Sequence, residues 1–130
     1  MAIFVVHEHH AKHLHFDFRL EMEGVLKSWA VPKGPSMNPA DKRLAVMVDD
    51  HSLEYGSFEG VIPEGRYGAG AVIIWDKGNC KMLGGDIGSG RLEFELSGKK
   101  LKGAFVLAKM KGKDKEWLLI KKKDEHAVKS

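Results

Sequence analysis

The sequence holds a single cysteine, Cys80, in 130 residues. A lone cysteine excludes an intramolecular disulfide and any multi-cysteine zinc or iron–sulfur site, and it is typical of a reducing compartment. No apolar run approaches the ~18 residues that a membrane-spanning helix needs, and the Met1 end is too short and too polar for a signal peptide. We therefore expect a cytoplasmic protein with no membrane partner.

The excess of positive charge is small, because Lys and Arg total 21 and Asp and Glu total 18, a formal +3. The distribution is uneven: residues 99–130 hold 11 lysines against 4 acids, and residues 1–98 hold 10 basic residues against 14 acids. A basic tail on an acidic body indicates a polyanionic partner, although a solvated lysine face is an alternative. With 43% hydrophobic and 30% charged residues, the chain is expected to fold as one globular domain, residues 1–130.

Apolar and polar residues alternate along most of the chain, and this period of two residues predicts β-strands. The runs are 3–6, 13–20, 25–31, 43–49, 57–62, 71–76, 91–97, 103–109 and 116–121. About eight or nine short strands favour an all-β closed barrel, because closure removes exposed sheet edges. Asn38 before Pro39 is the one pattern typical of a helix start, so we expect one or two short helices.

Two glycine-rich segments, residues 63–70 and 84–90, are predicted to connect strands. The first, PEGRYGAG, lacks both GxGxxG and GxxxxGK[ST], so we interpret it as a turn and not as a nucleotide-binding loop. Trp29, Trp75 and Trp117 each lie in an apolar strand pattern and are expected in the core. Neither glycines nor tryptophans therefore indicate a ligand.

Histidine is concentrated near the start of the chain, where six of seven lie within residues 1–51. One face of the strand predicted at 13–20 is apolar and fills a core; it carries Leu14, Phe16, Phe18 and Leu20. The opposite face carries ligand-type side chains about 6.5 Å apart, namely His13, His15, Asp17, Arg19 and Glu21. This row predicts a metal site with an anion-binding group beside it.

His9 and His10 lie just upstream, and a short turn can bring either against His15. Two imidazoles and a carboxylate suit Mn²⁺, Zn²⁺ or Fe²⁺, and open coordination positions favour a catalytic role. His7 and His13 are the least expected ligands. The alternative is that the histidines are exposed and unliganded on a barrel rim.

A second polar cluster follows the strand at 43–49 and contains Asp49, His51 and Tyr55. Within that strand Arg43 shares a face with Ala45, Met47 and Asp49. If this face lines the same pocket as Arg19, cationic and hydrogen-bonding groups surround an oxyanion there, as phosphoryl transfer requires. The alternative is a strand end with a capping histidine and a packed tyrosine.

The chain closely resembles the 3′-phosphoesterase domain of bacterial DNA ligase D in three ordered segments: HHAKHLHFDFRLEMEGVLKSWAVPKGPS, KRLAVMVDDHSLEYGSFEGVIPEGRYGAGAVIIWDKG and EWLLIKKKD. The resemblance implies a β-barrel enzyme of DNA repair by non-homologous end joining. It implies a Mn²⁺-dependent phosphodiesterase that removes a 3′-terminal ribonucleoside from a DNA or RNA/DNA primer–template. A phosphomonoesterase step then removes the remaining 3′-phosphate and leaves a 3′-OH.

Carried over position by position, the metal ligands of that family fall on His9, His15 and Asp17, which selects His9 over His10. Mn²⁺ is the expected ion, with Co²⁺ and Zn²⁺ as substitutes. The catalytic and phosphate-contacting residues fall on Arg19, His51 and Tyr55, and those important mainly for phosphate removal fall on Lys33 and Arg43. Glu21 and Asp49 are second-tier positions, and relatives often have Gln in place of His7.

Two alternatives compete with this interpretation. A cupin-like metal enzyme is suggested by His13-x-His15 followed by an acid, but PEGRYGAG lacks the histidine of the second cupin motif. A non-catalytic nucleic-acid-binding barrel would use aromatic residues and lysines alone, and it leaves His9, His15 and Asp17 unexplained. We expect a monomer that acts alone or recruits ligase and polymerase activities in trans.

Overall fold

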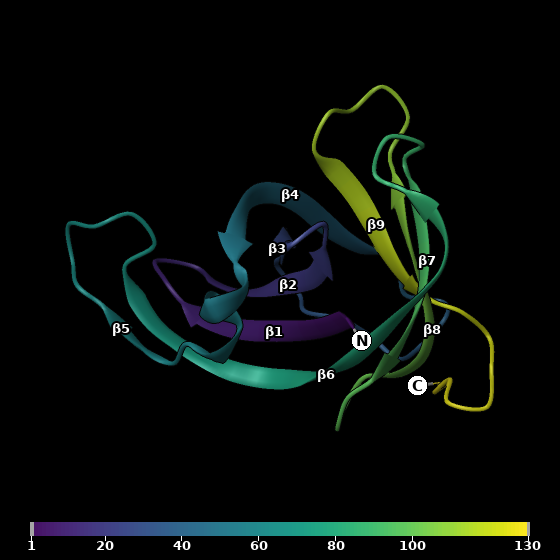
Figure 1. Cartoon of the computed structure of the whole chain (residues 1–130), viewed down its shortest axis with the longest axis horizontal. Helices are drawn as coiled ribbons and strands as arrows, with labels where there is room; N and C mark the ends of the chain where they lie inside the picture. The colour runs from purple at the N-terminus through teal and green to yellow at the C-terminus, as the bar shows by residue number, and fades with distance from the viewer. Residues whose placement is uncertain (1, 130) are drawn as a thin grey trace.

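The computed structural model describes residues 2–129, which form nine strands and one short 3₁₀ helix (Figure 1). In chain order the elements are β1 (Ala2–His10), β2 (Leu14–Met22), β3 (Val25–Val31), β4 (Arg43–Ser52), η1 (Leu53–Ser57), β5 (Gly60–Ile62), β6 (Gly70–Asp86), β7 (Arg91–Ser97), β8 (Lys102–Lys109) and β9 (Glu116–Lys121). Within this range no helix has the length and apolar character to cross a membrane.

Eight of the strands described for residues 2–129 close into an antiparallel barrel in the order β1-β2-β3-β4-β9-β8-β7-β6, and β6 pairs back with β1. Closure depends on the length of β6. Its first part pairs with β1 as far as Cys80, and its last part pairs with β7 from Asn79 onward, as Figure 1 shows. The short β5 pairs with the beginning of β6. The predicted all-β closed barrel is confirmed.

The apolar face of each strand meets the others inside the barrel. Trp29 and Trp117 lie there edge to face, with ring centroids 5.7 Å apart, and both are almost fully buried. Cys80 belongs to the same core, and the partly buried Trp75 packs against this core. The predicted strands at 25–31, 91–97 and 116–121 have the observed bounds.

The predicted helix start at Asn38 is wrong. Asn38 instead forms a turn, in which its side-chain Oδ1 accepts the N–H of Ala40 at 2.9 Å and its carbonyl accepts the N–H of Asp41 at 3.0 Å. The Ser36 hydroxyl donates to Asp41 at 2.6 Å and closes the loop. The described helix is η1, directly after β4.

Two local features of the backbone determine which side chains share a face. Glu23 and Gly24, both with positive φ (53° and 81°), form the two-residue connection between β2 and β3, a geometry that suits tight hairpins. A bulge in β4 then places the four residues from Val48 to His51 against three of β3, from Leu26 to Ser28. The extra residue reverses the alternation, so that His51 shares a face with Val48 and not with Met47.

Candidate active site

The polar faces of β1 and β2 lie side by side on the face of the sheet opposite the core. The hairpin register places His9 directly across from His15, and His7 across from Asp17. Directly paired residues on one face bring their side chains within contact distance. The three-residue connection between β1 and β2 therefore assembles the candidate metal ligands.

Three ligand atoms converge at this point. Nδ1 of His9 lies 3.2 Å from Nε2 of His15 and 3.6 Å from Oδ2 of Asp17, and Nε2 of His15 lies 3.2 Å from Oδ1 of Asp17. All ligand atoms fall within 4.8 Å of one another. The structure therefore brings together the predicted ligand set and selects His9; the neighbouring His10 is exposed and contacts Glu8 instead.

The outer nitrogens of both imidazoles are occupied by backbone carbonyls. Nε2 of His9 donates to the carbonyl of Gly68 at 2.8 Å, and Nδ1 of His15 donates to the carbonyl of His13 at 3.1 Å. These bonds fix the tautomer of each ring. They leave Nδ1 of His9 and Nε2 of His15 without a proton, and the lone pairs of these two nitrogens point at each other and at the Asp17 carboxylate. Such a set needs a proton or a cation between its members, so the residues fit a divalent metal.

The ionisation of Asp17 follows from its surroundings. Burial favours the neutral carboxyl group, but the hydrogen bond with His15 and the charge of Arg19 outweigh it and lower the pKa of Asp17. The same hydrogen bond with Asp17 raises the pKa of His15 against the effect of burial. The Asp17 side chain is thus an ionised carboxylate at neutral pH.

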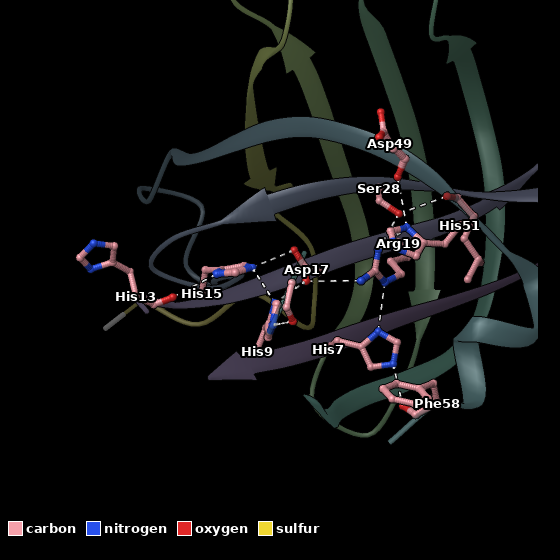
Figure 2. A network of polar contacts seen from close by, with 12 residues as sticks. His7, His9, His13, His15, Asp17, Arg19, Ser28, Asp49, His51 and Phe58 are labelled. Carbon is pink, nitrogen blue, oxygen red and sulfur yellow. Dashed lines mark hydrogen bonds and ion pairs between the residues drawn. The ribbon is translucent and has the colours of Figure 1, made fainter. Parts of the chain in front are cut away.

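Arg19 lies at the centre of the network that joins this cluster to the rest of the site, as Figure 2 shows. Its Nε donates to Nδ1 of His7 at 3.0 Å, and its Nη2 contacts Asp17 at 3.3 Å. Its Nη1 donates to the Ser28 hydroxyl at 2.9 Å and to Nδ1 of His51 at 3.1 Å. Only 3% of the Arg19 surface is exposed, so the guanidinium is fixed in place by these four partners.

The contact with Arg19 also determines the protonation of His51. Nδ1 of His51 lies near both Arg19 and the carbonyl of Asp49, and a guanidinium can only donate. Burial first, and then the charge of Arg19, lower the pKa of His51. His51 is therefore neutral near pH 7, with Nδ1 accepting from Arg19 and a proton on Nε2.

Tyr55, from η1, completes this side of the site. Its ring lies 5.0 Å from the guanidinium carbon of Arg19 and 4.6 Å from the ring of His51, and it stacks on Phe58. Burial raises the pKa of the Tyr55 hydroxyl. The phenol therefore stays protonated at neutral pH and can donate a hydrogen bond.

A cavity of about 350 Å³ joins these groups. Its lining includes the predicted residues His9, His15, Asp17, Arg19, His51 and Tyr55. Lys33 and Arg43 do not line it; they line a second cavity of about 380 Å³ with Asp41 and Lys42. Ala45 and Met47 of the predicted β4 face point to the core, so of that face only Asp49 lines the cavity that contains Arg19.

The two cavities nevertheless lie along one face of β3 and β4. Ala30 lines the first and Pro32, two residues further along, lines the second. On the neighbouring strand Val48 lines the first and Leu44 the second. Lys33 and Arg43 therefore flank the candidate metal ligands on the side of β3 and β4.

Sequence reasoning missed two contributors to the site. Ser28 binds Arg19 because the tight turn at Glu23 and Gly24 places it directly opposite Arg19, and that register could have been read from the turn. The segment at 63–70, interpreted only as a connection, contributes the Gly68 carbonyl that holds His9. No local signal identifies that role.

Comparison with known proteins gives a consistent result. The family model of the DNA Ligase D 3′-phosphoesterase domain matches residues 7–109. The multifunctional non-homologous end joining protein LigD of Pseudomonas aeruginosa is 51% identical over 129 residues, and that of Mycobacterium bovis is 44% identical over 124 residues. These matches cover 95% and 94% of this chain but only 15% and 16% of the relatives. They favour the phosphoesterase family over the cupin-like alternative.

Proposed function

Because this chain belongs to the DNA ligase D 3′-phosphoesterase family, we propose that it is a Mn²⁺-dependent enzyme that heals 3′ ends of DNA or RNA/DNA primer–templates. In the proposed reaction a phosphodiesterase step removes a terminal ribonucleoside, and a phosphomonoesterase step then removes the 3′-phosphate. The single observation that carries the proposal is one cavity lined by three metal-ligating side chains and by His51 and Tyr55.

His9, His15 and Asp17 would hold the metal ion. A divalent cation bound there supplies Lewis acidity toward a phosphate oxygen and lowers the pKa of an attacking water. The mixed nitrogen and oxygen ligand set suits Mn²⁺, with Co²⁺ and Zn²⁺ as substitutes. Three protein ligands leave coordination positions open, as a catalytic site requires.

His51 and Tyr55 face the substrate in this proposal. The Nε2–H of neutral His51 can donate a hydrogen bond to a phosphate oxygen and stabilise the negative charge that develops there in the transition state. The Tyr55 hydroxyl orients the phosphate. Arg19 is almost fully buried, so it acts chiefly by holding Asp17 and His51 and by placing a fixed positive charge behind the phosphate.

Lys33 and Arg43 extend the binding surface along β3 and β4. Among residues 2–129, the Nε of Arg43 is buried without a hydrogen-bond partner, and its Nη2 lies 3.6 Å from Asp41. A guanidinium with free donors suits a phosphate. These residues would bind phosphate oxygens of the primer end and matter mainly for phosphate removal, while lysines beyond residue 98 support the duplex in a salt-dependent way.

A 3′-phosphorylated primer–template and the same primer with one 3′-terminal ribonucleoside, each end-labelled, test the proposal across a series of divalent metals. Wild type is expected to convert both to 3′-OH ends with Mn²⁺, and His15→Ala and Asp17→Ala to convert neither. His13→Ala is the matched control, because His13 is exposed and offers only its carbonyl to His15. Activity that survives both ligand substitutions would overturn the metal assignment. DNA binding that is equal with and without metal, and no end processing, would instead support a non-catalytic barrel.

A further inference from the structure

The connection between β5 and β6, residues 63–69, closes the cavity on the side of His9. Tyr67 from this connection lines the cavity together with Ile62 and Gly68. The Tyr67 side chain takes no part in the metal and phosphate chemistry proposed above. It is nonetheless the one aromatic residue of this connection, and it directly precedes Gly68, whose carbonyl accepts the Nε2–H of His9.

Tyr67 is 96% exposed. A side chain with that exposure contributes almost nothing to the packing of the fold, whereas aromatic rings that serve packing are buried. Its backbone is well fixed by contrast: Arg66 donates to the carbonyl of Pro63 at 3.3 Å, and Ala69 donates to the carbonyl of Arg66 at 3.1 Å. The loop therefore presents an open ring from a defined position at the mouth of the site.

The chemistry of this end of the cavity differs from that of the phosphate end. Its lining side chains are those of Ala11, Ile62 and Tyr67, none of which carries a charge. A phosphate would find no cationic partner among them. The flat face of a nucleobase suits an exposed aromatic ring beside apolar side chains, since bases stack on such rings in many single-strand-binding proteins.

The order of the strands places this ring on one side of the metal ligands and the phosphate-binding groups on the other. The loop joins β5 to β6, and β6 pairs with β1; next come β2, β3 and β4. His9 lies on β1 and His15 and Asp17 on β2. Lys33 and Arg43 lie beyond them on the side of β3 and β4.

If Lys33 and Arg43 bind the primer phosphate next to the scissile one, which itself lies at the metal ligands, the primer approaches from their side. The departing nucleoside then lies across the metal ligands, on the side of Tyr67. We infer that Tyr67 is a stacking platform for the base of the 3′-terminal ribonucleoside that the phosphodiesterase step removes. The inference rests on the proposed function, and it adds a substrate contact specific to the first of the two steps.

The test uses three end-labelled primer–templates of one sequence. The first ends in a ribonucleoside, the second ends in 1-deoxyribose, which lacks the base, and the third ends in a 3′-phosphate. Tyr67→Ala is expected to lower kcat/KM on the first by about 10-fold, the effect of one lost stacking interaction. It is expected to leave kcat/KM unchanged on the other two, and Tyr67→Phe is expected to match wild type on all three.

Val61→Ala is the matched control, since Val61 is 74% exposed on the same hairpin and does not line the cavity. An equal loss on all three substrates would overturn the inference, because it would mean that the ring contacts a base of the primer or that the loop only positions His9. No loss on any substrate would also overturn it. A wild-type protein that processes none of the three would instead refute the proposed function itself.

Discussion

Nε of Arg19 donates to Nδ1 of His7 across 3.0 Å inside the protein, so His7 accepts on one nitrogen and donates from the other. Its Nε2 lies 3.1 Å from the carbonyl of Phe58. Burial, and next the charge of Arg19, lower the pKa of His7 to about 4, so the ring is neutral at physiological pH. His7 thus anchors the guanidinium that holds Asp17 and His51.

Replacement of His7 tests this anchoring role. A glutamine has one acceptor and one donor at its end, and it can accept from Arg19 and donate to Phe58. We expect His7→Gln to retain activity close to wild type. His7→Leu leaves a charged donor without its acceptor, and we expect kcat/KM for phosphate release to fall by about 10-fold or more.

Steady-state phosphate release measures both variants, and thermal unfolding shows whether each is folded. The pH profile of the folded variants separates anchoring from simple packing, since a displaced Arg19 changes the surroundings of His51. Equal activity of His7→Gln and His7→Leu would contradict the anchoring role.

The neighbours His9 and His10 give a second test. His9 points into the ligand cluster, and His10 is exposed. A metal that binds only the folded protein stabilises it by about 2.7 kcal/mol at 100 times its Kd. Thermal unfolding with added Mn²⁺ should therefore shift upward by several degrees for wild type and His10→Ala, and it should not shift for His9→Ala. A shift retained in His9→Ala would remove His9 from the ligand set.

Periodicity was sufficient to predict the barrel but not the full extent of β6. The pattern predicted a strand at 71–76, whereas β6 continues to Asp86. It passes through Gly78, where a Cβ would lie 2.1 Å from the carbonyl oxygen of Ser97. Glycine usually interrupts a strand pattern, but here it permits the close approach of another backbone. Only the tertiary pairing shows that difference.

The convergence of the three candidate metal ligands was predictable for a related reason, and the arrangement of the rest of the site was not. His9, His15 and Asp17 lie on one hairpin, where alternation and register are local properties. The side of the sheet on which His51 lies depends on a bulge in β4, and the burial of Arg19 depends on η1, which brings Tyr55 over it. Neither feature has a periodic signature in the sequence.

Acid should weaken one tertiary contact far from the site. Asp124 accepts from the buried ammonium of Lys121 at 2.6 Å. Burial of Asp124 opposes its ionisation, but hydrogen bonds from Ala104, Lys121 and His126 lower its pKa from 3.8 to about 2. A carboxylate with a lowered pKa stabilises the folded state fully above its ordinary pKa, and that contribution is lost as pH falls toward 2.

We expect Asp124→Asn to lower the free energy of unfolding by about 2 kcal/mol at pH 7, because Lys121 loses its counter-charge. Urea unfolding at a series of pH values should show the difference between variant and wild type shrinking below about pH 4. Glu93→Gln is the control: Glu93 pairs with Lys122, whose side chain is 43% exposed, and little change is expected. A difference that is constant down to pH 2 would exclude the ionised carboxylate as its source.

The separation of the two cavities predicts which residues act together. Lys33 and Arg43 line one cavity, whereas Tyr55 lines the other. Lys33→Ala and Arg43→Ala should each lower kcat/KM on a 3′-phosphorylated primer by about 10-fold. Their combination should cost clearly less than the product of the two effects, because both bind the same primer phosphate, next to the one at the metal ligands. Arg43→Ala combined with Tyr55→Phe should instead give the product within about twofold. Strong coupling between Arg43 and Tyr55, with independence of Lys33 and Arg43, would mean that Arg43 binds the reacting phosphate together with Tyr55, and it would contradict this arrangement.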